Sequence, residues 1–443
     1  MSNVRLGNDM ERQMESSTTV AQSTPKGAWK ITVLLLFYMV VNFADKIVVG
    51  LAGVPIMTEL KLTPAQFGFL GSAFFFLFSI ASILVGFLLN RFTARWVALS
   101  LALVWALVQF PMVWETSFAT LVVCRIILGA AEGPAIAVAL HAVFKWFPDE
   151  KRTLPAALIN QGSAFGVILA VPILNTLIVN HSWHAAFGAL GIVGLIWVAL
   201  WLWLGEEGPL VGRAAEKQAD EQTYPYATLL TSPTFIGSVV ATFGAYWVVS
   251  LGLTWFTPFL VKGLGFSQKE AGLISIVPWI LGSGITLVLS WVSQRLMARG
   301  VSSRGARAIL GSAPLILGGV LFIAAPYFEG RVLILSALTL ASCVCGLIFV
   351  VCPTMLGEFV PSRQRGAVLA IYGGLFSIAG VLSSVVMGGV VQQGATPLEG
   401  FLHGYQLNGV IILIAGIVGV LMLRPAGERA RLLRKATPLR EAT

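Results

Sequence analysis

Residues 30–52 read KITVLLLFYMVVNFADKIVVGLA, a long apolar run that carries Asn42, Asp45 and Lys46 in its second half. About 20 apolar residues in a helix are enough to cross a bilayer. A charge near the bilayer centre costs at least about 2.5–3.5 kcal/mol, so Asp45 and Lys46 need partners inside the membrane. The stretch therefore predicts a membrane-spanning helix and, within it, part of a functional site.

Similar apolar runs recur along all 443 residues, of which 57% are hydrophobic and only 11% charged. Soluble domains carry roughly 25% charged residues, so composition excludes a water-soluble protein. The sequence predicts an all-α integral membrane protein with twelve transmembrane helices. These are expected at 30–52, 66–89, 96–114, 117–141, 153–179, 184–205, 234–261, 269–293, 305–326, 332–357, 366–391 and 402–423.

The distribution of the 29 Lys and Arg residues predicts the topology. Apart from Lys46 and Arg125, nearly all lie in the two tails and the even-numbered loops. The odd-numbered loops hold only Lys61, Lys262, Lys269 and Arg331. Because short loops rich in Lys and Arg stay in the cytoplasm, we expect both termini to be cytoplasmic. Topology leaves Lys46 and Arg125 unexplained.

The two halves of the chain echo each other on either side of a polar stretch at 206–233. Asn90-Arg91-Phe92-Thr93-Ala94-Arg95 follows the second span, and Gln294-Arg295-Leu296-Met297-Ala298-Arg299 follows the eighth. Two parallel six-helix repeats with a site at their interface are a transporter architecture. The expected parts are a disordered cytoplasmic tail (1–29), a six-helix bundle (30–205), a cytoplasmic linker (206–233), a second bundle (234–424) and a cytoplasmic tail (425–443).

Two motifs carry a resemblance to a known family. The first span reads Asn42-Phe43-Ala44-Asp45-Lys46, and the fourth reads Arg125-Ile126-Ile127-Leu128-Gly129-Ala130-Ala131-Glu132-Gly133-Pro134. They are similar to N-Y-x-D-R and R-x-x-L-G-x-x-E of the bacterial anion:cation symporters, and the chain resembles the major facilitator superfamily over nearly all its length. The resemblance implies proton-coupled uptake of a sugar acid or other small organic anion across the bacterial inner membrane. It also implies a monomer without cofactor or metal, with the proton gradient as its energy source.

The loop motifs depart from the family pattern. Asn90 and Thr93 stand where the family usually has Asp and Gly, and Gln294 replaces the Asp of the second half. We therefore expect weakened salt bridges at the cytoplasmic gate. Glu358 ends the tenth span beside the cytoplasmic Arg363 and Arg365, and we expect it to form a gate or an end-of-helix ion pair. The gating residues that the resemblance implies are Arg91, Arg95, Arg295, Arg299 and Glu358.

Helical spacing relates the charged residues to one another. Arg125 and Glu132 lie two turns, about 10.5 Å, apart on one face of the fourth span. Gly129 between them would leave that face open to a neighbouring helix or a ligand. Asn42 and Lys46 share a face of the first span.

Asp45 points about 100° away from Lys46. By resemblance, spans one and four line the substrate cavity, so Asp45 would face Arg125 while Lys46 reaches the substrate. Making and breaking an Asp45–Arg125 pair would move the carboxyl between proton-binding and proton-releasing conditions, with Glu132 as the second proton site. Lys46 would hold the substrate carboxylate, since a cavity cannot stably hold an anion beside two ionised acids. Alternatively, the four charges only lock helices together.

Further polar and aromatic residues are candidate substrate contacts. Polar groups inside spans need partners, which neighbouring helices could also supply, and aromatic residues in spans often form the interfacial belt. The candidates are Asn42, Asn160, Gln161, Ser163, Tyr246, Trp255, Tyr372 and Ser377.

Three other functions stay open. A proton-driven exporter shares the fold, but the chain reads Gly162-Ser163-Ala164-Phe165-Gly166 followed by Val167-Ile168, without the exporters' G-x-x-x-G-P-x-x-G-G pattern. An integral-membrane enzyme would show catalytic motifs such as H-E-x-x-H or G-x-S-x-G, which are absent. A facilitator without proton coupling fits if Asp45 and Glu132 are structural.

Overall fold

The computed structural model describes residues 24–89, 91–114, 116–148, 151–210, 223–428 and 430–431. Within these ranges every regular element is a helix, and twelve helical segments are long and apolar enough to cross a membrane. The predicted all-α fold with twelve transmembrane helices is therefore confirmed. Most of the tails, part of the linker (211–222) and Asn90 lie outside the described residues.

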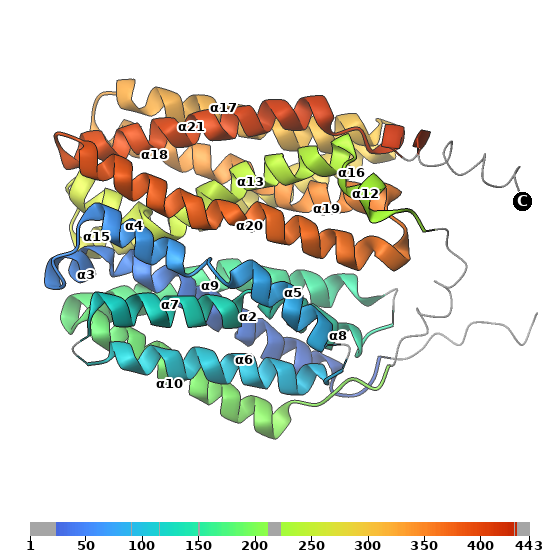
Figure 1. The fold of residues 1–443 in the computed structure, drawn as a ribbon, viewed down its shortest axis with the longest axis horizontal. Helices are drawn as coiled ribbons and strands as arrows, with labels where there is room; N and C mark the ends of the chain where they lie inside the picture. The colour runs from blue at the N-terminus through green and yellow to red at the C-terminus, as the bar shows by residue number, and fades with distance from the viewer. Residues whose placement is uncertain are drawn as a thin grey trace, which may run out of the picture.

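The first half of the chain forms the blue-to-green part of Figure 1, and the second half lies above it in yellow-green to red. The helices of the first half are α2 (Ala28–Leu51), α3 (Gly53–Glu59), α4 (Pro64–Ala73), α5 (Phe78–Leu88), α6 (Ala94–Gln109), α7 (Phe118–Glu132), α8 (Ala135–Phe144), α9 (Thr153–Asn180) and α10 (Trp183–Leu204). A 3-10 turn, η1 (Phe110–Met112), follows α6.

The second half repeats this succession. Its elements are α12 (Tyr226–Leu230), α13 (Pro233–Thr254), α14 (Phe256–Pro258), η3 (Phe259–Gly263), α15 (Gln268–Ile274), α16 (Val277–Ala298), η4 (Arg304–Ile309), α17 (Leu310–Ala324), η5 (Ala325–Tyr327), α18 (Arg331–Cys343), η6 (Val344–Leu347), α19 (Ile348–Phe359), α20 (Ser362–Gln393) and α21 (Pro397–Met422). The eighth span runs from Gln268 to Ala298, beyond the predicted 269–293, because the helix continues into a polar end that hydropathy does not count.

Glycines let matching helices of the two halves pack closely. In the first half α2 packs against α9, where a Cβ at Gly162 would lie 2.5 Å from that of Met39, and α6 packs against α10. In the second half α13 packs against α20, and α17 against α21, where a Cβ at Gly319 would lie 2.8 Å from the backbone oxygen of Gly409. In the first half, span one packs on span five and span three on span six. In the second half, span seven packs on span eleven and span nine on span twelve, so the halves are structural repeats.

Hydroxyl side chains begin several of these helices by accepting a hydrogen bond from a backbone N–H of the first turn. The capping residues are Thr63 (α4), Ser117 (α7), Ser182 (α10), Ser232 (α13), Ser267 (α15) and Thr396 (α21). Thr63 and Ser267 form reciprocal capping boxes with Gln66 and Glu270. A short polar pattern thus fixes where these helices enter the bundle.

The two halves are joined at one end of the bundle, which we call the distal end. This is the end opposite the first turn of α2, the last turn of α21 and the described linker residues 206–210 and 223–230, where Figure 1 shows α3 and α15. Gln268 donates from Nε2 to the carbonyl of Leu51 (2.8 Å), and the backbone N–H of Ala65 donates to Gln392 Oε1 (3.2 Å). Nearer the middle, Ser79 Oγ lies 3.3 Å from the carbonyl of Gly374.

Between described residues of the two halves, no hydrogen bond or ion pair lies closer to the end with the linker than those of Ser79. The hydrogen bonds between the halves are therefore one-sided, although α5 also packs against α20 beyond Ser79.

Candidate functional site

Four charged side chains from two helices meet inside the first half of the bundle. Helix α2 contributes Asp45 and Lys46, and α7 contributes Arg125 and Glu132. Their exposed fractions are only 1%, 7%, 3% and 1%, respectively. Asp45 lies within electrostatic range of the other three, so the predicted constellation is assembled.

Lys46 and Glu132 form a buried ion pair. Lys46 Nζ lies 3.2 Å from Glu132 Oε2 and also donates to Asn42 Oδ1, one turn earlier on α2. Removing one partner of such a pair costs about 3–5 kcal/mol, since the other charge is left uncompensated. Sequence spacing placed Lys46 and Glu132 on faces of their own helices but did not indicate that they pair.

Asp45 and Arg125 meet in a different way from the side-chain pair expected. Gln109, at the end of α6, donates from Nε2 to Asp45 Oδ1 (2.9 Å). Arg125 donates from Nη1 to the backbone carbonyl of Asp45 (3.4 Å) rather than to its carboxylate. The sequence interpretation missed Gln109, whose only signal was an amide side chain in an otherwise apolar span.

Aromatic rings surround the two cations. Lys46 Nζ lies 4.5 Å from the ring centre of Phe43 and 5.9 Å from those of Phe74 and Phe78. The guanidinium carbon of Arg125 lies 4.5 Å from the ring centre of Phe74. A cation over a ring face is stabilised by the ring quadrupole, more strongly where water is excluded.

A break in the second span brings these rings to the charges. Helix α4 ends at Ala73 and α5 begins at Phe78, and α7 fits against the break through Gly129 and Gly133. A Cβ at Gly129 would lie 1.6 Å from the backbone oxygen of Phe74, and one at Gly133 would lie 2.3 Å from that of Phe78. The face between Arg125 and Glu132 is therefore occupied by the neighbouring backbone.

Several buried polar atoms around the charges have no hydrogen-bond partner among the described residues. They are Tyr38 Oη, Asn42 Nδ2, Gln109 Oε1, Arg125 Nε and Glu132 Oε1. Buried polar atoms in proteins are nearly always paired, with protein or with water. Donors and acceptors left in this way can serve a proton, a water or a bound anion.

The second half supplies rings and hydroxyls next to the charges. Tyr246 on α13 lies within electrostatic range of Glu132, and its ring centre is 5.9 Å from that of Phe75. The hydroxyl of Tyr372 is 2.6 Å from Thr242 Oγ1, and Ser377 is hydrogen-bonded to Ser79 across the interface between the halves. Tyr246 and Ser377 thus lie at this interface.

The structure places the remaining substrate candidates elsewhere. Trp255 donates to the carbonyl of Ser384 (3.2 Å) and packs on Phe67, at the distal junction of the halves. Asn160 is exposed and donates to the carbonyl of Ala156 (2.9 Å).

Two neighbours on α9 complete the set. Ser163 donates to the carbonyl of Asn160 (2.8 Å), and Gln161 is half-buried. The hydrogen bonds of Asn160 and Ser163 are local to α9, and none of these three residues joins the charged group in this structure.

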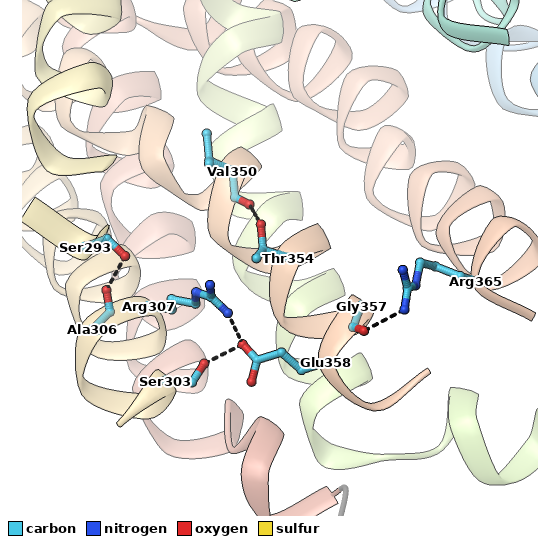
Figure 2. A network of polar contacts seen from close by, with 9 residues as sticks. All are labelled: Ser293, Ser303, Ala306, Arg307, Val350, Thr354, Gly357, Glu358 and Arg365. Carbon is cyan, nitrogen blue, oxygen red and sulfur yellow. Dashed lines mark hydrogen bonds and ion pairs between the residues drawn. The ribbon is translucent and has the colours of Figure 1, made fainter. Parts of the chain in front are cut away.

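Glu358 forms an ion pair at the end of its helix. Figure 2 shows its carboxylate accepting hydrogen bonds from Arg307 and Ser303 (2.6 Å for Ser303 Oγ), whereas Arg365 donates to the carbonyl of Gly357 (2.9 Å). The partner is thus Arg307 and not the nearby Arg365. Arg307 lies in η4, at the start of the ninth span, and η4 packs against α19.

A second carboxylate ties loops of the first half together. Glu207 accepts from the backbone N–H of Arg95 (3.0 Å) and pairs with Lys145. Partial burial alone would raise the pKa of Glu207, but Lys145 and the N–H groups of Arg95 and Ala94 outweigh it and hold that pKa below its ordinary value.

The other predicted gating residues lie exposed at the surface. Arg91 and Arg299 are exposed, and Arg295 stacks on Trp291, with its guanidinium carbon 4.9 Å from the ring centre. In the described ranges no group of three or more His, Cys, Asp or Glu residues could hold a metal ion.

Comparisons with known proteins agree with this arrangement. Residues 34–384 match the family described as the Major Facilitator Superfamily. The chain is 26% identical to the hexuronate transporter of Bacillus subtilis (strain 168), over 90% of this chain and 97% of that protein. It is 25% identical to the "Probable galactarate/D-glucarate transporter GudP" of the same strain, over 92% and 94%.

Among solved structures, a bacterial homologue of the human lysosomal transporter Spinster, in an inward-facing and occupied conformation, aligns with a TM-score of 0.76 at 17% identity, over 92% of this chain and 99% of that one. The names of the family and of these relatives indicate a transporter rather than an enzyme.

Proposed function

Because the chain belongs to the Major Facilitator Superfamily, we propose that it is a proton-coupled symporter that takes up a small organic anion by alternating access. The observation that carries the proposal is the buried pair of Lys46 and Glu132 beside the interface of the halves. The relatives named for hexuronate and galactarate/D-glucarate transport support an anionic substrate.

The ion pair couples the anion to a proton through competition for one cation. While Glu132 is ionised, Lys46 Nζ is neutralised at 3.2 Å and an anion gains little from it. A proton on Glu132 releases the ammonium group, and the carboxylate of the substrate then takes the place of Glu132. The unpartnered Nδ2 of Asn42 supplies a second donor for that carboxylate.

Asp45 and Arg125 form a second proton site in the proposal. The guanidinium holds the backbone of Asp45, and Gln109 holds its carboxylate. A small rotation between α2 and α7 would exchange these contacts for a direct Asp45–Arg125 pair. The carboxyl would then alternate between two environments as the halves move.

Orientation follows from charge. The end of the bundle with the linker carries the loops rich in Lys and Arg, which we assign to the cytoplasm of a bacterial inner membrane. Contacts between the halves at the distal end then correspond to an inward-facing state. The two six-helix bundles, 30–205 and 234–424, would rock about the site as a monomer, with residues 206–233 as a cytoplasmic linker.

Proteoliposomes that report internal pH test this proposal. Adding a pool of sugar acids and other organic anions should acidify the lumen, and Asp45→Asn and Glu132→Gln should each abolish the signal. Protein-free liposomes control for weak acids that cross the bilayer unaided. Alkalinisation by lipophilic cations would favour an exporter, whereas anion uptake without proton movement would favour a facilitator.

A further inference from the structure

The surface next to the buried charges consists largely of aromatic carbon. Asp45, Lys46, Arg125 and Glu132 are buried, whereas rings from both halves near them are only partly buried. These partly buried rings are Phe43, Phe78, Tyr246, Trp279, Phe349 and Phe376. A molecule that approaches Lys46 from between the halves therefore meets ring faces and edges before it meets a charge.

The rings form two groups that each cross the interface and that meet at Lys46, whose Nζ lies near Phe43 of one group and Phe78 of the other. In the first group, Phe43 of α2 lies 6.2 Å from Trp279 of α16, between ring centres. In the second group, Phe78 lies 5.7 Å from Phe75, which lies 5.9 Å from Tyr246 in the other half.

The second group continues within the second half. Tyr246 contacts Phe376 at 5.2 Å and Phe349 at 6.3 Å. These separations suit edge-to-face and offset ring contacts, which a further ring between them could join.

The six rings carry only two polar atoms, the hydroxyl of Tyr246 and the indole N–H of Trp279. Of the hydroxyls beside them, Ser79 and Ser377 are bonded to each other, and Tyr372 is bonded to Thr242. The unpartnered Asn42 Nδ2 lies beside Lys46, where it suits a carboxylate. A polyhydroxylated acid would bury hydroxyls against carbon without partners, which opposes binding.

We propose that the site takes a carboxylate that bears an aromatic ring rather than a polyhydroxylated sugar acid. Its carboxylate binds Lys46 Nζ and Asn42 Nδ2, and its ring lies among Phe43, Phe78 and Tyr246. The inference rests on the proposed function only in that both place an organic anion at Lys46. The relatives named for sugar acids share about a quarter of their residues with this chain, which leaves room for a different substrate class.

A binding titration separates the two substrate classes. The purified full chain is titrated by calorimetry at mildly acidic pH with phenylacetate and, separately, with D-galacturonate. Phenylacetate should bind saturably, and D-galacturonate should bind at least roughly tenfold more weakly. Lys46→Gln should remove phenylacetate binding.

Ring deletions test the position of the aromatic group. Phe43→Leu keeps an apolar side chain and should weaken phenylacetate binding roughly two- to tenfold. The matched control is Phe69→Leu on α4, whose ring packs on Phe76 and Phe118 away from both groups, and which should leave binding unchanged.

Tighter binding of D-galacturonate than of phenylacetate would overturn the inference and leave the proposed function intact. So would proton uptake driven by a non-aromatic anion in liposomes while phenylacetate fails to bind. If no anion moves protons but phenylacetate binds, the proposed coupling fails and the substrate inference stands.

Discussion

Replacing Glu132 by Gln should uncouple anion binding from pH. Lys46 Nζ and Glu132 Oε2 are 3.2 Å apart, with side-chain exposures of 8% and 0%. At an effective dielectric constant of about 20, two unit charges at this distance attract by about 5 kcal/mol before desolvation is subtracted. An anion that must displace an ionised Glu132 therefore competes with a strong partner.

The size of the effect is best expressed as the slope of log Kd against pH. If one proton must bind Glu132 before the anion binds Lys46, affinity falls about tenfold for each pH unit above the range in which Glu132 is protonated. The neutral amide of the Glu132→Gln variant mimics the protonated acid at nearly constant volume. The slope of log Kd against pH should therefore be smaller by about one in Glu132→Gln than in the wild type, and the variant should bind more tightly at alkaline pH.

Calorimetric titration of the purified protein across a pH series measures this slope. The anion used is the one that gives the largest signal in the liposome assay. Glu59→Gln is the matched control, because Glu59 is 47% exposed and bonded to His184 and Trp183 at the distal end. An unchanged slope in Glu132→Gln, or an equal change in Glu59→Gln, would refute the competition between Glu132 and the anion.

Three further outcomes follow from the geometry. Gln109→Leu removes the hydrogen bond that Gln109 donates to the Asp45 carboxylate, worth about 1.5–3 kcal/mol for a charged acceptor, and should shift the pH profile of uptake in liposomes. Gly129→Ala should prevent folding, because the added Cβ would lie 1.6 Å from a backbone oxygen, and the variant should aggregate in size-exclusion chromatography. The control, Gly86→Ala, should be tolerated, because nothing lies within 4 Å of its added Cβ. Glu207→Gln should lower the free energy of unfolding at neutral pH by about 0.2–1 kcal/mol. Because the folded pKa of Glu207 is depressed, the difference between wild type and variant is present above the unfolded pKa of about 4. It should be lost as the pH falls through the lower folded pKa.

Hydropathy and charge predicted the fold because both are set by the membrane. Every span had to be apolar over its length, and Asp45, Lys46, Arg125 and Glu132 were conspicuous for breaking that rule. The ends of spans were predicted less well: α16 continues through Arg295 to Ala298, since a helix does not stop where hydrophobicity does.

The sequence predicted which residues belong to the site better than it predicted which of them pair. Spacing along α7 fixes the angle between Arg125 and Glu132, but the rotation of α7 against α2 depends on how Gly129 seats on the broken second span. Lys46 consequently faces Glu132, and Arg125 reaches only a backbone carbonyl of Asp45. Glu358 pairs with Arg307 for a similar reason, because η4 packs against α19.

The two repeats have become unequal in their chemistry. In the described part of the chain, the buried acidic and basic residues of the spans all belong to α2 and α7, whereas α13, α16, α19 and α20 offer that centre rings and hydroxyls. On the proposed function, the residues that bind protons therefore lie in the first half, whereas the substrate contacts both halves. A chimera that joins this first half to the second half of a relative would keep the four charges and exchange the rings and hydroxyls that face them, so that specificity could change by recombination at the linker.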